Sequence, residues 1–156
     1  MLKYALMALC STTLALGGAA KSPAWLSIES PVNPYDAATR GDVLLVHAML
    51  HSGDTQLAEL TGTAEGLVNG SRRSIPLRFD VTSRPNVFGL RRQWPNEGAW
   101  ILRISLRETT AIVTFDRTGS VASAVVPTSS TSSGMPLPRS VSRGEVDSTL
   151  SAAARR

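Results

Sequence analysis

The sequence predicts an all-β protein built as an antiparallel sandwich of about seven to eight strands. Two observations support this prediction. Between residues 25 and 126 the chain consists of short apolar and β-branched runs separated by turn residues at short spacing. No stretch in this region repeats its apolar residues with the helical period of about 3.6 residues. A barrel with a similar number of strands is the alternative that these observations leave open.

The first two expected strands flank a loop. Residues 24–29 alternate around Trp25, and residues 31–42 carry the Pro, Asn, Asp and Gly residues of a connection. Residues 43–50 are almost continuously apolar and stop at the turn residues 52–54. A run of this length favours a strand in the interior of a sheet over a helix.

The turn at Asn69-Gly70 is the strongest hairpin signal in the chain, because both residues accept a positive φ. It predicts that residues 57–68 and 72–81 are paired strands. The remaining expected strands lie between later turn signals and cover residues 87–94, 99–106, 111–115 and 121–126.

Two tryptophans bracket a turn that begins at Pro95. Trp100 opens an alternation that should face the core, with Trp100, Leu102, Ile104 and Leu106 on one side of the strand. We expect Trp100 to be the central packing residue, opposite the apolar run of residues 43–50. Trp94, next to the proline, is the candidate anchor for a partner protein if it is half exposed, but structural packing is the alternative that the residue type favours.

The expected architecture is immunoglobulin-like in its strand number and patterning. The two cysteines and the intervening tryptophan of antibody-type domains are missing, since Cys10 is the single cysteine of the chain. The label therefore refers to architecture alone.

The first twenty residues have the pattern of a signal peptide. Lys3 precedes the almost wholly apolar residues 4–16, and small residues at positions 18–20 suit a signal peptidase. We expect cleavage after Ala20, a periplasmic or secreted protein, and no stable membrane insertion afterwards, because no later run approaches the about 20 apolar residues that a bilayer requires. Lipidation of Cys10 after an earlier cut is the alternative.

The composition changes after Pro127. Residues 128–156 are rich in Ser, Thr and Pro, with few residues able to bury apolar surface. We expect one monomeric domain at residues 21–127 and a disordered tail at residues 128–156. A short helix over residues 145–154, which the alanines there favour, is the alternative, but a lone helix of that length is marginal in water.

His47, Met49 and His51 are the only set with a metal-binding pattern. Residues two apart in a strand point to the same side, so these imidazoles and the thioether could be ligands to copper. The alternative is structural: Met49 fills the core, and His47 and His51 satisfy their nitrogens locally.

Catalytic and nucleic-acid-binding functions are not expected. The chain has no nucleophile elbow, and its carboxylates are scattered, so the requirements for nucleophile, base and oxyanion donor cannot be met together. The sixteen basic residues are interleaved with twelve acidic ones and form no basic stripe. The sequence predicts no enzyme and no cofactor.

Residues 62–66, 69–70, 75–77 and 94–102 resemble exported bacterial domains of the YtkA-like and CopC-like group. The similarity extends over residues 25–116, and its clearest part is the turn glycine, small residue, tryptophan and alternating apolar residues at positions 98–102. The resemblance implies an exported, non-enzymatic sandwich module that is accessory to an envelope or membrane protein. CopC-type members also bind copper through an amino-terminal histidine, whereas cleavage after Ala20 would expose Lys21 here.

The sequence therefore predicts an exported module that binds another cell-envelope component. A periplasmic copper-binding carrier that uses His47, Met49 and His51 is the alternative function.

Overall fold

The computed structural model describes residues 23–50 and 59–155, and within them it confirms the all-β class. Strands dominate, and a single helix lies near the carboxyl end. The elements are β1 (Trp25–Glu29), β2 (Leu44–Met49), β3 (Leu60–Val68), β4 (Ser71–Pro76), β5 (Asp80–Val81), β6 (Val87–Leu90), β7 (Ala99–Leu106), β8 (Thr109–Phe115), β9 (Val121–Val125), β10 (Thr128–Ser130), β11 (Pro136–Pro138) and α1 (Arg143–Ala154). The signal peptide predicted at residues 1–20 lies outside the described residues.

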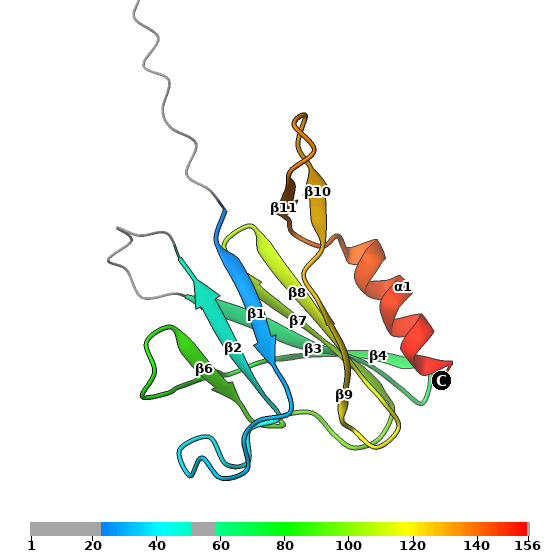
Figure 1. The fold of residues 1–156 in the computed structure, drawn as a ribbon. Helices are drawn as coiled ribbons and strands as arrows, with labels where there is room; N and C mark the ends of the chain where they lie inside the picture. The colour runs from blue at the N-terminus through cyan, green and yellow to red at the C-terminus, as the bar shows by residue number, and fades with distance from the viewer. Residues whose placement is uncertain (1–22, 51–58, 156) are drawn as a thin grey trace, which may run out of the picture.

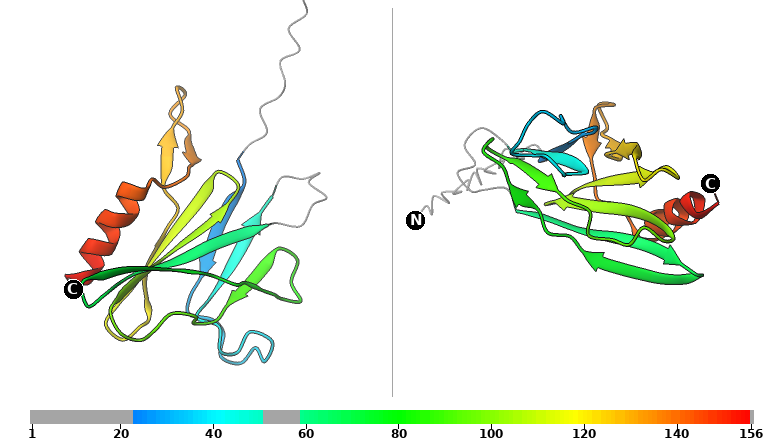
Figure 2. Two further views of the ribbon diagram at one scale, coloured as in Figure 1. Left: turned by 180° about the vertical axis from the view of Figure 1, so that it is seen from behind. Right: turned by 90° about the horizontal axis from the view of Figure 1, so that it is seen from below.

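Two antiparallel sheets form the body of the molecule (Figure 1). The first, here called sheet A, has the order β1-β2-β6-β5, and the second, sheet B, has the order β4-β3-β7-β8-β9. A separate hairpin of β10 and β11 projects beyond them and leads into α1 (Figure 2).

The main core lies between the two sheets. Leu44, Val46 and Ala48 of β2 supply it from sheet A, and every second residue of β7 supplies it from sheet B. Trp100 is 4% exposed and belongs to this cluster, as the alternation of its strand predicted. Its indole Nε1 donates a hydrogen bond to the carbonyl oxygen of Glu97 at 2.7 Å, so the buried polar atom has a partner.

The hairpin at Asn69-Gly70 is present, and both residues have positive φ, 50° and 75°. The expected single strand at residues 72–81 is wrong, because the chain leaves sheet B at Pro76 and residues 80–81 join sheet A as β5. The backbone N–H of Leu77 still donates to the carbonyl oxygen of Gly62 at 2.9 Å, and after this bond the chain crosses to sheet A.

The prediction of a disordered tail is also wrong for residues 128–155. Val146 and Leu150 of α1, together with Val141 ahead of the helix, are buried in a second apolar cluster. The cluster is completed by Ile101 and Ile112, which point to the face of sheet B opposite the main core. Val146, Leu150 and Ala153 are spaced four and three residues apart, so they lie on one face of a helix. Docking against these isoleucines stabilises a helix that would be marginal alone.

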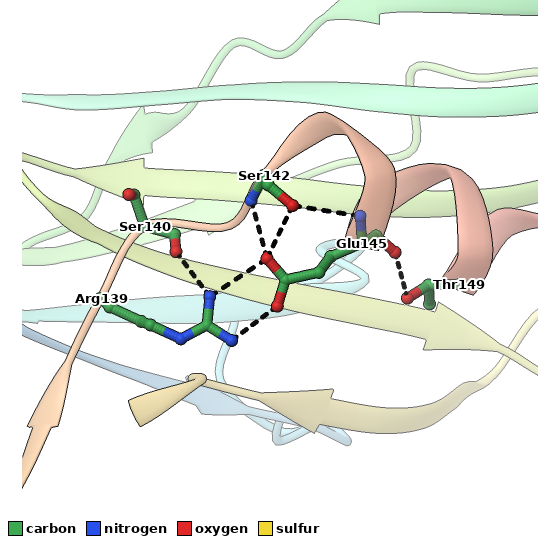
Figure 3. A network of polar contacts seen from close by, with 5 residues as sticks. All are labelled: Arg139, Ser140, Ser142, Glu145 and Thr149. Carbon is green, nitrogen blue, oxygen red and sulfur yellow. Dashed lines mark hydrogen bonds and ion pairs between the residues drawn. The ribbon is translucent and has the colours of Figure 1, made fainter. Parts of the chain in front are cut away.

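Local polar contacts fix where α1 begins (Figure 3). Ser142 is the N-cap, and its side chain accepts a hydrogen bond from the backbone N–H of Glu145, whose carboxylate accepts one from the backbone N–H of Ser142. Arg139 binds the same carboxylate in a bidentate manner, at 2.5 and 3.1 Å. These bonds, first among them that from Arg139, lower the pKa of Glu145 from 4.5 to about 2. Within the described part of the chain no helix is long and apolar enough to cross a membrane.

Candidate functional site

The outward face of sheet A carries the most distinctive exposed side chains. Trp25 of β1 and Met49 of β2 are directly paired across the ladder and are 37% and 46% exposed. Their side chains are therefore neighbours on one surface. The sequence positions explain the exposure, because the alternate residues Leu26 and Ala48 are the ones that enter the core.

A charged group lies next to this apolar pair. His47 Nε2 is 2.8 Å from Glu29 Oε2, and the guanidinium of Arg84 approaches the same oxygen at 3.7 Å. The three residues come from β2, β1 and the connection between β5 and β6, so the contacts tie together neighbouring strands of sheet A. The surface thus combines an aromatic ring and a thioether with a partly exposed ion pair.

Asp42 contributes a buried carboxylate at the start of β2. Its side chain is 5% exposed, and one carboxylate oxygen lies 3.5 Å from Arg91 Nε. The carboxylate also lies against Gly89, in the space that a Cβ atom would occupy if position 89 carried a side chain. Burial raises the pKa of Asp42 above its ordinary value of 3.8, and the attraction of Arg91 offsets only part of this effect. Glycine at position 89 is therefore required by the close approach of this carboxylate.

The structure brings two of the three predicted copper ligands to one face. His47 and Met49 both lie on the outward side of sheet A, whereas His51 lies outside the described residues. The imidazole Nε2 is held by Glu29, so a metal ion would have to share or replace this contact. Residues 23–50 and 59–155 contain no cluster of three or more His, Cys, Asp or Glu side chains suited to a metal ion.

Trp94 is buried, in agreement with the packing alternative, and is not a half-exposed anchor for a partner protein. It is 4% exposed, its ring centroid is 5.2 Å from that of Phe115, and the guanidinium of Arg92 lies 5.5 Å from the indole ring. Trp94 belongs to the apolar cluster of the main core. The candidate partner-binding residue Trp94 is thus a packing residue.

The exposed tryptophan is Trp25, which sequence reasoning placed in a strand without assigning it a role. The signal that could have found it is the parity of its strand. If Leu26 and Ile28 face the core, Trp25 must face outward.

Comparison of this chain with protein-family models, with curated proteins and with solved structures finds no match.

Proposed function

We propose that this chain is an exported, immunoglobulin-like sandwich module without chemistry of its own, and that it binds another protein of the cell envelope through the outward face of sheet A. The observation that carries the proposal is the exposed Trp25–Met49 pair beside the His47–Glu29 ion pair. An apolar centre with a polar rim is the usual anatomy of a protein–protein interface, and tryptophan and methionine are enriched in such centres.

The strand order supports the immunoglobulin-like part of the proposal. In immunoglobulin nomenclature, the order β1-β2-β6-β5 corresponds to strands A-B-E-D, and β4-β3-β7-β8 corresponds to C′-C-F-G. β9 extends the second sheet by one strand. The YtkA-like and CopC-like resemblance is of the same kind and stays a prediction.

The pattern of residues 1–20 supports export to the periplasm or out of the cell. In such a compartment a non-catalytic domain with an exposed tryptophan and methionine is suited to docking on an envelope or membrane protein.

Site-specific crosslinking tests the proposed face. A photoreactive amino acid at position 25 should give a discrete crosslinked adduct in the native envelope, and the same residue at position 125, which is also exposed but on sheet B, should not. Trp25→Ala combined with Met49→Ala should abolish co-purification of the adduct partner without changing the thermal midpoint by more than a few degrees. Adducts that form equally from both positions, or not at all from position 25, would contradict the proposal.

Copper binding is the second candidate, because His47 and Met49 lie on the same accessible face. It predicts stoichiometric binding of Cu(I) or Cu(II) by the purified protein. The affinity should fall strongly in His47→Ala and in His51→Ala, and should not fall in Glu29→Gln, which leaves both imidazoles and the thioether in place. Binding no tighter than that of the unfolded chain would exclude a carrier function.

A further inference from the structure

A pocket of about 490 Å³ lies on the other sheet, between α1 and the outward face of sheet B. Three arginines line it from three different elements: Arg72 from β4, Arg103 from β7 and Arg143 from the first turn of α1. Glu65 is the single carboxylate among the lining residues, and Val141 and Val146 give the pocket an apolar side.

Arg72 and Glu65 form an ion pair with each other. Arg72 Nη2 is 3.2 Å from Glu65 Oε2, and its other terminal nitrogen pairs with Asp147 of α1. Glu65 also accepts a hydrogen bond from Ser74 at 2.8 Å. Burial opposes ionisation of Glu65, but the hydrogen bonds it accepts outweigh burial and lower its pKa. The Glu65 carboxylate is therefore ionised and already bonded to Arg72 and Ser74. Arg72 is fixed by its ion pairs with Glu65 and Asp147.

Arg103 and Arg143 remain without a counter-charge. In residues 23–50 and 59–155 no ion pair and no side-chain hydrogen bond involves either guanidinium. Arg103 is half buried in a central strand, between Thr63 and Ile112 on its neighbours, and α1 lies over the same face. The half-buried Arg103 and the exposed Arg143 carry like charges beside one pocket, and an anion bound between them would offset their mutual repulsion.

We propose that this pocket binds the phosphate group of a phosphorylated ligand. Guanidinium groups match phosphate oxygens with paired N–H donors, which makes arginine the preferred residue for phosphate recognition. Arg103 and Arg143 supply the N–H donors that have no other partner among the described residues, and the fixed guanidinium of Arg72 lines one side of the pocket. The two valines, Val141 and Val146, would contact an organic substituent of the ligand. Arg143 reaches the pocket only because α1 is docked, so the site exists only when the carboxyl-terminal segment is folded.

Calorimetric titration of the purified protein with inorganic phosphate, against chloride at matched ionic strength, tests the site directly. We expect saturable binding of phosphate, weakened about tenfold or more in Arg103→Met and in Arg143→Met, as the loss of a charge-assisted contact implies. Arg117→Met is the matched control, because Arg117 lies in the β8–β9 turn outside this pocket, and its affinity should be unchanged. Circular dichroism melts establish that each variant is folded.

A second arm distinguishes a free phosphorylated ligand from a lipid headgroup. Flotation with vesicles of phosphatidylcholine, with and without phosphatidylglycerol, should show binding only to the anionic vesicles if the source is a lipid, and Arg103→Met should abolish it. Binding of phosphate without flotation indicates a soluble ligand, and either result supports the phosphate site. No preference of the folded protein for phosphate or for the anionic vesicles, or an equal loss in Arg117→Met, would overturn the proposal.

Discussion

At the scale of single residues, the central tryptophan depends on a neighbour that has no side chain. Gly66 of β3 lies opposite Trp100 of β7, and the indole ring occupies the space that a Cβ at position 66 would need. The ring therefore lies across the neighbouring strand, with its N–H bonded to Glu97. Any side chain at position 66 would force the indole out of the core.

Both Trp100→Ala and Trp94→Ala should reduce the free energy of unfolding by about 3–5 kcal/mol, because both indoles are buried in the main core and each leaves a cavity. Urea denaturation monitored by circular dichroism measures both losses. A half-exposed Trp94 would instead give a clearly smaller loss at position 94. A loss under about 1 kcal/mol there, with the full loss at position 100, would restore the half-exposed assignment of Trp94.

Asp42 should make stability fall as the pH rises. Its pKa is higher in the folded state than in the unfolded chain, so the folded state favours the protonated carboxyl. The contribution of Asp42 is most favourable below the unfolded value of 3.8 and is lost as the pH rises through the raised folded value. Relative to Asp42→Asn, the wild type should therefore lose unfolding free energy as the pH rises above 3.8. A difference between the two proteins that stays constant or grows with pH contradicts this assignment.

At the scale of elements, α1 is held by a small apolar seam and by the contacts at its first turn. The seam consists of Val141, Val146 and Leu150 against Ile101 and Ile112. Removing the helix would expose the two isoleucines, which belong to strands of the main sheet. The carboxyl-terminal segment is thus part of the domain.

Truncation after Pro127 should lower the thermal midpoint by about 5 °C or more, since in a domain of this size 1 kcal/mol corresponds to a shift of several degrees. The buried seam supplies that energy. Leu150→Ala should reproduce part of the loss in the intact chain, and Ser148→Ala, an exposed change on the same helix, should not. An unchanged midpoint after truncation would return the segment to the status of a dispensable tail.

The start of α1 should loosen in acid. The pKa of Glu145 is lowered to about 2, so its contribution is complete above its ordinary value of 4.5 and is lost as the pH falls from there through about 2. Amide hydrogen exchange at residues 143–150 should therefore show protection that falls, relative to β7, over that pH range. In Glu145→Gln the protection should be lower near neutral pH and should depend little on pH. Equal pH dependence in both proteins would mean that another group controls the helix.

At the scale of the whole molecule, the two sheets differ in what covers their outward faces. α1 packs on sheet B (Figure 1). It contributes to the arginine pocket there, while the Trp25–Met49 pair of sheet A stays exposed. The two proposed sites therefore lie on different sheets and share no residue.

Independence of the two sites is itself a prediction. Trp25→Ala should leave phosphate affinity unchanged, and Arg103→Met should leave crosslinking from position 25 unchanged, because changes at distant sites without common contacts act additively. The double variant should show both losses in full. Loss of both functions in either single variant would indicate that the two sheets are coupled, or that the variant is misfolded, which its thermal midpoint would reveal.

Local patterns determined the all-β class, the hairpin at Asn69-Gly70 and the inward side of β7. Each of these follows from a short-range rule: period-two alternation, or the positive φ that a tight turn requires. The same alternation implies that Trp25 is exposed, because its neighbour Leu26 faces the core. It also places His47 and Met49 on one face of the sheet. That much of the candidate site could be read from the sequence.

Only the tertiary structure decided the exchange of the chain between sheets at Pro76, the burial of Trp94 and the docking of α1. Each depends on contacts between residues far apart in the chain: Trp94 is buried because Phe115 meets it, and α1 is stable because Ile101 and Ile112 offer it an apolar surface. The arginine pocket has the same origin, since Arg72, Arg103 and Arg143 are separated by about thirty to forty residues in sequence and meet only when the helix docks. Local periodicity indicates which side of a helix or strand is apolar. Which other element that side packs against depends on the tertiary structure.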